Sequence, residues 1–373
     1  MSGALEKIGR KKFEAFIGLD GFVDEVVHVV DQREDERTFT RIETISGYAD
    51  RIREGSGLST NIEIVPVTAK MGGNGPIYAY GLKKFGVSIT YVGCVGNPDI
   101  HPIFRNLAEG SRMIGLADPG MTDAMEFKDG KIIRSKLNSL NLLTWEDIKT
   151  KIGAAYLAEL FDKADVISLN NWTMIPHMSD IWRHIQHETV PLMKSDRSDK
   201  IMFFDLADPR KRSGKDILDA LNLICGFRQQ GFFTVLGLNL KEARLIGSYI
   251  NRTQRTEQDM NRISLEDLVN QIQGYIKTDC LTVHPVDRAA CILKGIYAEV
   301  PGPYCENPVL TTGAGDVFNS GFVFGLLNRL TPEQCLLLGT AASGYYVRTG
   351  QWAGLEELKK FLNTWLGAGQ EET

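Results

Sequence analysis

Cysteine is scarce in this chain, and its spacing excludes two kinds of site. Only six of the 373 residues are cysteine, and none of them forms a C-x-x-C pair. A zinc knuckle or a dithiol redox centre needs closely spaced pairs, so the pattern argues against both. Most of the cysteines lie within apolar runs, where cysteine acts as a small hydrophobic residue. We therefore expect reduced thiols and a cytoplasmic location.

Long apolar runs and an excess of positive charge are missing as well. No stretch approaches the roughly 20 apolar residues that a membrane-spanning helix needs. Residues 1–12 are polar and charged, without an apolar signal region. The formal net charge is −5, whereas a nucleic-acid-binding protein usually carries a basic stripe. We therefore expect neither a membrane nor a nucleic acid as a partner.

Short apolar segments alternate with helical patterns along most of the chain. The segments are rich in β-branched and aromatic residues, which favours strands. The predicted strands are residues 13–19, 62–69, 88–95, 164–169, 200–206, 232–238 and 280–284. The predicted helices include residues 77–85, 156–161 and 265–276. This alternation predicts an α/β fold with a doubly wound, mostly parallel sheet and helices on both of its faces.

Turn and capping residues predict three local features outside this alternation. Asp129-Gly130 is a dipeptide typical of tight primed turns, and it predicts a hairpin of residues 123–128 and 131–135. A second hairpin is expected around Lys294-Gly295, at an edge of the sheet. Thr331 followed by proline, with glutamine three residues after the threonine, predicts the start of a helix.

A polar, charged stretch after the first strand contains strand-like pieces at 22–30 and 38–45. Together with the first hairpin, this stretch predicts a small β lid that projects from the main sheet. We interpret the lid as segments at about 20–66 and 118–138, inserted in a single domain of residues 1–373. A pair of plain surface insertions is the alternative.

The clearest chemical feature is the segment Thr-Thr-Gly-Ala-Gly-Asp at 311–316, which leads directly into an apolar helix pattern. Its glycines let the backbone approach a ligand closely. A helix N-terminus presents free N–H groups and a partial positive charge, so the segment predicts an anion site suited to phosphate oxygens. Asp316 in the first turn could take a proton from an acceptor hydroxyl during phosphoryl transfer. A plain helix-capping role is the alternative for this aspartate.

The same segment matches neither of two common nucleotide-binding motifs. After Gly313 and Gly315, a dinucleotide fingerprint would place a third glycine at position 318, which is phenylalanine. The chain also contains no G-x-x-x-x-G-K-[ST] sequence, so it has no P-loop. An oxidoreductase on a related sheet therefore lacks its expected cofactor motif.

The segment 311–316 and its glycine-spaced helix resemble the C-terminal motif of the ribokinase-like (PfkB-type) carbohydrate kinases. The resemblance extends over residues from about 13 to 350. It implies that Asp316 is the catalytic base and that the backbone at Gly313, Ala314 and Gly315 forms an anion hole. It also implies ATP as the phosphoryl donor, with Mg²⁺ bridging the phosphates.

Two earlier motifs resemble the substrate-binding parts of this family. Met-Gly-Gly-Asn at 71–74 is similar to the Gly-Gly substrate loop, which implies acceptor contacts by Gly72, Gly73 and Asn74. Asp24 matches the substrate-binding aspartate of the family's N-terminal strand, and Asp20 is a second candidate. An ordinary strand-to-helix turn and a loop carboxylate are the respective alternatives.

Further matches concern the nucleotide and the metal. Asn239 and Glu242 match the family's N-x-x-E element, which implies a role at the nucleotide and a water-mediated contact of Glu242 with Mg²⁺. The alternative is a helix start with asparagine as the cap and glutamate three residues later. The resemblance also implies nucleotide contacts by Thr312, Arg210 and Ser343.

Three positions depart from the family pattern. Leu310 stands where the family often has an aspartate near a monovalent-cation site, and Ile77 replaces an asparagine of the Gly-Gly loop. His284-Pro285 replaces a glycine-containing stretch near the nucleotide, and we expect His284 to be a structural residue. These departures leave a catalytically inactive sugar- or nucleoside-binding protein as an alternative.

Asp316 with its glycine-rich turn, and the pair Asn239 and Glu242, favour the active enzyme. We therefore predict an ATP-dependent kinase that phosphorylates a hydroxyl of a sugar or sugar-like small molecule. The residues do not identify which sugar, sugar acid or nucleoside is the acceptor. A homodimer formed through the lid is a further expectation.

Overall fold

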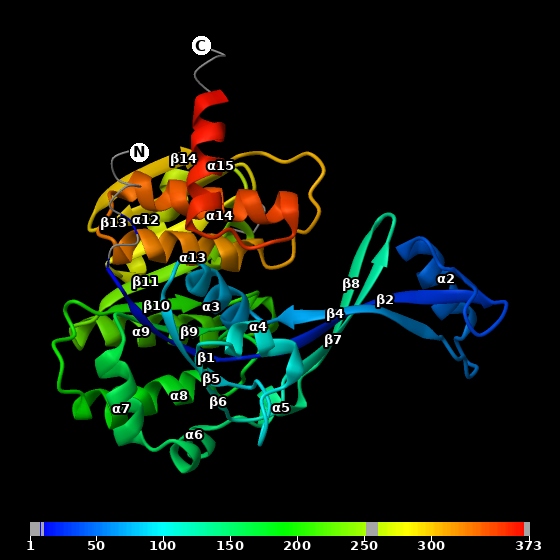
Figure 1. Cartoon of the computed structure of the whole chain (residues 1–373), viewed down its shortest axis with the longest axis horizontal. Coiled ribbons are helices and arrows are strands. Elements are labelled where there is room, and N and C mark those ends of the chain that lie inside the picture. The colour runs from blue at the N-terminus through cyan, green and yellow to red at the C-terminus, as the bar shows by residue number, and fades with distance from the viewer. Residues whose placement is uncertain (1–7, 9–10, 251–259, 369–373) are drawn as a thin grey trace.

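The chain folds into a body and a projecting arm, each built on its own β-sheet (Figure 1). The structure, a computed structural model, describes residue 8 and residues 11–250 and 260–368. Within these residues no helix is both long and apolar enough to cross a membrane.

The body contains a nine-stranded sheet in the order β14-β13-β12-β11-β10-β9-β1-β5-β6. Its strands are β1 (Glu14–Leu19), β5 (Ser88–Gly93), β6 (Arg112–Gly115), β9 (Val166–Asn170), β10 (Ile201–Asp205), β11 (Phe233–Asn239), β12 (Cys280–His284), β13 (Arg288–Leu293) and β14 (Ile296–Pro301). Neighbouring strands are parallel from β6 to β12, whereas β13 and β14 run antiparallel at one edge. The edge hairpin expected around Lys294-Gly295 is confirmed.

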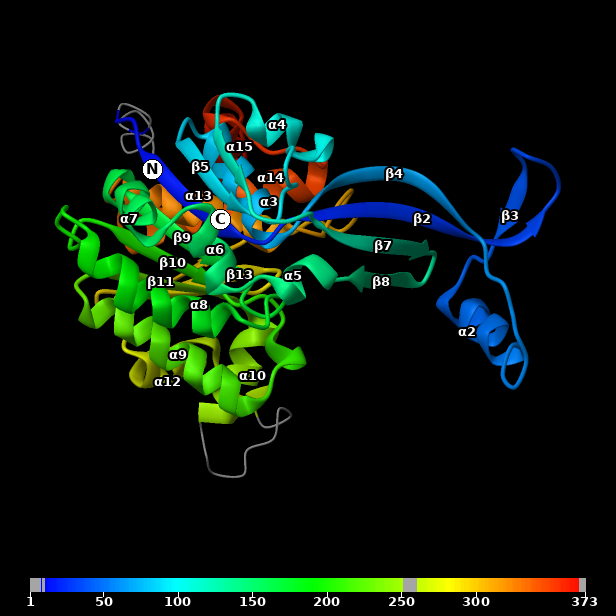
Figure 2. The same cartoon turned by 90° about the horizontal axis from the view of Figure 1, so that it is seen from below.

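Helices cover both faces of this sheet (Figure 2). One face packs against α6 (Trp145–Lys151), α7 (Ala154–Lys163), α8 (Met178–His184), α9 (Gly214–Gln229), α10 (Leu240–Ile250) and α12 (Leu265–Ile276). The other packs against α3 (Asn74–Lys84), α4 (Arg105–Ala108), α13 (Ala314–Leu327), α14 (Pro332–Thr349) and α15 (Leu355–Ala368). The predicted doubly wound α/β fold is confirmed, because two apolar cores lie on opposite sides of a mostly parallel sheet.

Short elements complete the body. They are η1 (Pro102–Phe104), α5 (Asn138–Leu142), η2 (Ile185–Thr189), η3 (Val190–Leu192) and η4 (Pro209–Lys211).

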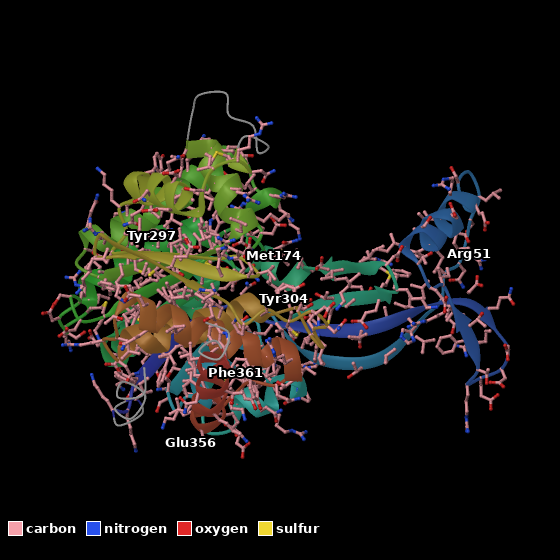
Figure 3. All side chains as sticks on the ribbon, turned by 90° about the horizontal axis from the view of Figure 1, so that it is seen from above. Arg51, Met174, Tyr297, Tyr304, Glu356 and Phe361 are labelled. Carbon is pink, nitrogen blue, oxygen red and sulfur yellow. The ribbon has the colours of Figure 1, made fainter. Side chains whose placement is uncertain are left out.

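The arm is a second sheet of five strands, which we call the arm sheet. It comprises β2 (Phe22–Arg33), β3 (Phe39–Arg41), β4 (Ile64–Gly72), β7 (Gly120–Phe127) and β8 (Gly130–Lys136). Helix α2 (Ile45–Glu54) lies at its far end, where Arg51 is labelled in Figure 3. Val27, Val29 and Met125 form a small separate core with Ile42 and Tyr48. The arm sheet therefore has apolar packing of its own, away from the body.

Two strand predictions in this region are wrong in part. The strand predicted at 62–69 is β4, which pairs with β2 of the arm sheet and not with the main sheet. Its middle residues are exposed and include Pro66, which suits an edge strand. The strand predicted at 38–45 ends at Arg41, because Thr44 caps α2 by accepting a hydrogen bond from Gly47 N–H at 3.0 Å.

The chain enters and leaves the arm at the carboxyl edge of the main sheet. Strand β2 begins three residues after β1 ends, and β4 leads back into α3 through Gly73. The carboxyl ends of parallel strands are where ligands bind in open α/β sheets. The fold therefore brings the root of the arm, the start of α3 and these strand ends together.

Candidate active site

The glycine-rich segment forms a tight turn at the start of α13. Gly313 is the N-terminal cap residue with φ +85°, a conformation that favours glycine. The first helical bond runs from Val317 N–H to the Gly313 carbonyl at 3.0 Å, and Ala314 N–H bonds the Thr311 carbonyl at 3.2 Å. No side chain caps this helix start. The amides of Gly313 and Gly315 therefore lie at a helix N-terminus suited to an anion.

Asp316 lies one residue beyond this turn, and only 8% of its surface is exposed. The side-chain amide of Asn74 donates a hydrogen bond to Asp316 Oδ1 at 2.9 Å. Asn74 is the first residue of α3, after Gly73 at φ +97°. The Gly-Gly loop thus reaches the predicted base directly, a contact that the spacing in the sequence does not reveal.

Three more buried acids surround Asp316. Asp205 ends β10, Glu242 lies in the first turn of α10, and Asp20 follows β1. Burial raises the pKa of Asp20 and of Asp205 to about 6. Burial, with the nearby charges of Asp205 and Asp20, holds the pKa of Asp316 well above its ordinary value, while the Asn74 hydrogen bond lowers it. A carboxylate with a raised pKa is a stronger base once it is ionised.

The two candidate aspartates of the first strand region differ in their surroundings. Asp20 is fully buried, and its carboxylate accepts hydrogen bonds from Gly75 N–H at 3.0 Å and from Asn171 Nδ2 at 2.8 Å. It therefore anchors the start of α3. Asp24 lies on β2 beneath Gly72, where an added Cβ would be 2.4 Å from its carboxylate. A side chain at position 72 would therefore displace the Asp24 carboxylate, and glycine there lets the two residues approach closely.

Asn239 and Glu242 exchange hydrogen bonds at the start of α10. This is the helix start with an asparagine cap that the sequence analysis gave as the alternative to a nucleotide and metal role. Glu242 accepts hydrogen bonds from the Asn239 backbone N–H at 2.9 Å and from its side-chain amide at 2.6 Å. Asn239 Oδ1 accepts from Glu242 N–H at 2.9 Å. Burial and the charge of Asp205 hold the pKa of Glu242 well above its ordinary value. The pair thus caps α10 beside the acid cluster.

The oxygen atoms near Asp205 fit a hydrated magnesium ion. Among the described residues, no group of three or more His, Cys, Asp or Glu side chains could hold a metal directly. Asn170 and Asn319 are buried beside Asp205, and each has a side-chain oxygen without a protein partner. Mg²⁺ usually keeps several waters and binds through one or two carboxylates and substrate phosphates.

Two cavities of about 320 Å³ each lie on either side of the turn. The first is lined by Asn239, His284, Ala314, Gly315 and Ser343, among others, which places four predicted site residues around one space. The second is lined by Asp24 and Thr312 with Leu310, Ile77 and Trp352. Thr312 therefore faces the cavity of Asp24 and not the cavity of Ser343.

His284 and Arg210 occupy contrasting environments. The His284 ring packs on Phe318 with 4.7 Å between centroids, and an added Cβ at Gly315 would be 2.9 Å from its Cε1 atom. Burial lowers the pKa of His284 to about 4, so the ring is neutral at physiological pH. Arg210 is exposed on η4 and lines neither cavity.

Three asparagines of the site, Asn170, Asn171 and Asn319, were not predicted from the sequence, unlike Asn74 and Asn239. Asn170 ends β9, and Asn171, the next residue, adopts a left-handed conformation at φ +60° and donates a hydrogen bond to Asp20. Asn319, on α13, donates to Asp205 at 2.9 Å. The one available signal was an Asn-Asn pair directly after a buried strand, since polar residues at strand ends line ligand sites.

Known proteins resemble this chain over nearly its whole length. A family model described as prokaryotic ketohexokinase matches residues 9–365. A ketohexokinase from Haloferax volcanii is 28% identical over 354 residues, which cover 94% of this chain and 90% of that protein.

Solved structures share the fold at lower identity. Adenosine kinase from Sinorhizobium meliloti aligns with a TM-score of 0.63 at 18% identity, covering 97% of this chain and 100% of that chain. Ribokinase from Arabidopsis thaliana, solved with ribose and ATP, aligns with a TM-score of 0.60 at 14% identity, covering 94% and 99%. These likenesses show a common fold.

Proposed function

The chain belongs to the prokaryotic ketohexokinase family, and we propose that its acceptor is a ketohexose. It is an ATP-dependent carbohydrate kinase that phosphorylates a sugar hydroxyl. The relatives lend no support to the inactive binding protein considered above. The match to ketohexokinases supports the ketohexose. The observation that carries the phosphoryl-transfer mechanism is the buried Asp316 at the glycine-rich start of α13, which accepts a hydrogen bond from Asn74 of the Gly-Gly loop.

In the proposed mechanism, Asp316 takes the proton of the acceptor hydroxyl. The freed oxygen attacks the γ-phosphorus in line, and the bond to the bridging oxygen of ADP breaks. The amides of Gly313 and Gly315 would stabilise the charge on the transferring group. Ala314 N–H is already bonded to Thr311, so its contribution requires a small shift of the turn.

The cavity of His284 and Ser343 is the proposed nucleotide site, and the acceptor lies between the Gly-Gly loop and the arm sheet. Asp24 and the backbone at Gly72 and Gly73 would hold the sugar hydroxyls. Glu242, with Asn239 and Asp205, would hold Mg²⁺ through water. The metal supplies charge neutralisation between the phosphates. Closure of the arm over the sugar would exclude water and suppress ATP hydrolysis.

The test compares the native protein with Asp316→Asn in ATP-consumption assays with Mg²⁺. The acceptor panel contains ketohexoses, aldohexoses, pentoses, sugar acids and nucleosides, and nuclear magnetic resonance of the product identifies the phosphorylated hydroxyl. We expect ketohexoses to be the best acceptors and Asp316→Asn to lose about a thousandfold or more in kcat. Glu356→Gln, on the surface of α15, is the control. Turnover by Asp316→Asn at the native rate would refute the role of the aspartate.

A homodimer through the arm sheet is part of the proposal. Val26, Ala124 and Ile133 are register partners on neighbouring strands, and of these Val26 and Ala124 are buried whereas Ile133 is 54% exposed. In the proposed dimer, the exposed Ile133 of β8 contacts a second copy. Analytical ultracentrifugation should find a dimer for the native protein and a monomer for Ile133→Lys. The control Arg134→Ala, on the opposite face, should remain dimeric.

The cysteines support the expected cytoplasmic location. All six are unpaired, and four of them are buried. Free thiols persist in a reducing compartment.

A further inference from the structure

The glycine-rich turn is contacted by a tyrosine of α14 that also lines the cavity of Asp24. Tyr346 is 2% exposed, and its hydroxyl donates a hydrogen bond to the Thr312 carbonyl at 2.9 Å. A Cβ added at Gly313 would lie 3.3 Å from the Tyr346 hydroxyl oxygen and 2.9 Å from Ile77 Cδ1. The turn therefore rests directly on Tyr346 and Ile77.

Trp352 completes this support. Its ring packs edge-on against Tyr346 with 5.1 Å between centroids, and its Nε1–H donates to the Ile77 carbonyl at 3.2 Å. Burial and the charges of Asp316 and Asp24 raise the pKa of Tyr346, so its hydroxyl keeps its proton throughout the working pH range. The tyrosine is thus a permanent donor in a fixed place.

The direction of one amide follows from this contact. In a trans peptide unit, the C=O and the N–H of the next residue point in opposite directions. Tyr346 draws the Thr312 carbonyl towards α14, so the N–H of Gly313 points away from α14. Gly313 has the left-handed φ of +85° and no side chain to restrain it, so a rotation of this peptide would meet little local resistance.

We propose that Tyr346 is a positioning residue that sets the orientation of the Gly313 amide in the anion hole. Sequence motifs do not assign this role, because Tyr346 is 34 residues beyond Thr312. An oxyanion-hole donor contributes only when it is aimed correctly before the reaction begins. The inference rests on the proposed kinase function, since it assigns Tyr346 to the same transition state.

The test is Tyr346→Phe, which removes the hydroxyl and retains the ring that packs on Trp352. We expect kcat to fall about tenfold or more, with the KM values for sugar and ATP within about twofold of the native values. Thermal unfolding should remain cooperative. The control is Tyr345→Phe, one residue earlier on α14, where the ring packs against Phe361 (labelled in Figure 3).

A binding measurement gives a second readout that does not need a sugar. ADP with Mg²⁺ and aluminium fluoride imitates the transferring phosphoryl group, and calorimetry compares its affinity with that of ADP and Mg²⁺ alone. Tyr346→Phe should bind ADP with Mg²⁺ as tightly as the native protein does. The ratio of its affinity for the mimic to its affinity for ADP should be about tenfold lower than in the native protein. Native kcat and native mimic binding in Tyr346→Phe would overturn the inference alone. A native protein that phosphorylates no sugar would instead overturn the proposed function, and the inference with it.

Discussion

At the scale of single residues, the chemistry of Asp316 depends on the other acids around it. Its raised pKa comes from burial first, then from the charges of Asp205 and Asp20. Since the proposed base Asp316 must be ionised to accept a proton, kinase activity should be lost as the pH falls through the raised pKa of this group. A neighbouring negative charge moves this limit to higher pH, and its removal moves the limit back.

Asp205→Asn should therefore shift the acid limb of the kcat/KM profile to lower pH. The substitution removes a negative charge that opposes ionisation of Asp316, while the amide keeps the size of the side chain. The measurement is the pH dependence of kcat/KM for the sugar at saturating ATP and Mg²⁺. The control, Asp219→Asn, alters a surface ion pair with Arg183 and should leave the limb in place. If the acid limb of Asp205→Asn lies at the same pH as that of the native protein, the charge of Asp205 does not raise the pKa of Asp316.

At the scale of elements, α14 begins at the protein surface with a capping box, and residues further along the helix lie at the proposed site. Thr331 and Gln334 exchange hydrogen bonds in a capping box at its exposed beginning, and Pro332 occupies the first turn. Further along, Ser343 lines the proposed nucleotide cavity and Tyr346 supports the anion-hole turn. The helix cap and the proposed site residues therefore lie at separate places along one helix.

Thr331→Ala should lower the free energy of unfolding by about 1 kcal/mol without changing kcat or KM. The loss follows because the first amides of α14 lose a side-chain acceptor at a site distant from the cavity. Urea denaturation and steady-state kinetics check the two parts. Thr331→Ser, which keeps the acceptor oxygen, is the matched control. A large fall in kcat without a fall in stability would show that the two functions are not separable.

At the scale of the whole molecule, the buried carboxyl groups, whose ionisation destabilises the fold, lie together at one edge of the main sheet. Asp20, Asp205, Glu242 and Asp316 are buried at the carboxyl ends of the strands or beside them. The folded pKa of Asp20 and of Asp205 is about 6, above the ordinary value of 3.8, so the folded protein binds these protons more tightly than the unfolded chain does. Their contribution to stability is fully present below about pH 4 and is lost as the pH rises through about 6.

Asp316→Asn should therefore unfold at a higher temperature than the native protein at about pH 8, by a few degrees. At about pH 5 a larger share of the native Asp316 is protonated, so the difference in melting temperature between the two proteins should be smaller. Differential scanning calorimetry without nucleotide or Mg²⁺ measures both. A lower melting temperature for Asp316→Asn at both pH values would show that the charge of Asp316 does not destabilise the folded protein. Activity would be lost in exchange for stability, as is common for catalytic residues.

The sequence by itself determined the features that depend on near neighbours. The alternation of apolar segments and helical patterns predicted the doubly wound sheet, and Asp129-Gly130 predicted the β7–β8 hairpin, which is observed with its two-residue turn one position earlier, at Lys128-Asp129. Thr331 and Gln334 likewise predicted the start of α14. Propensity, periodicity and capping act within a few residues, so they can be read along the chain.

Only the tertiary structure decided which distant side chains meet. Asn74 donates to Asp316 across 242 positions, and Asn319 donates to Asp205 across 114. The placement of β4 in the arm sheet likewise depended on its pairing with β2. These outcomes follow from how helices and strands pack around a shared sheet edge, and no local pattern encodes that geometry. The motif thus indicated the proposed base, whereas packing placed the amides, acids and tyrosine around it.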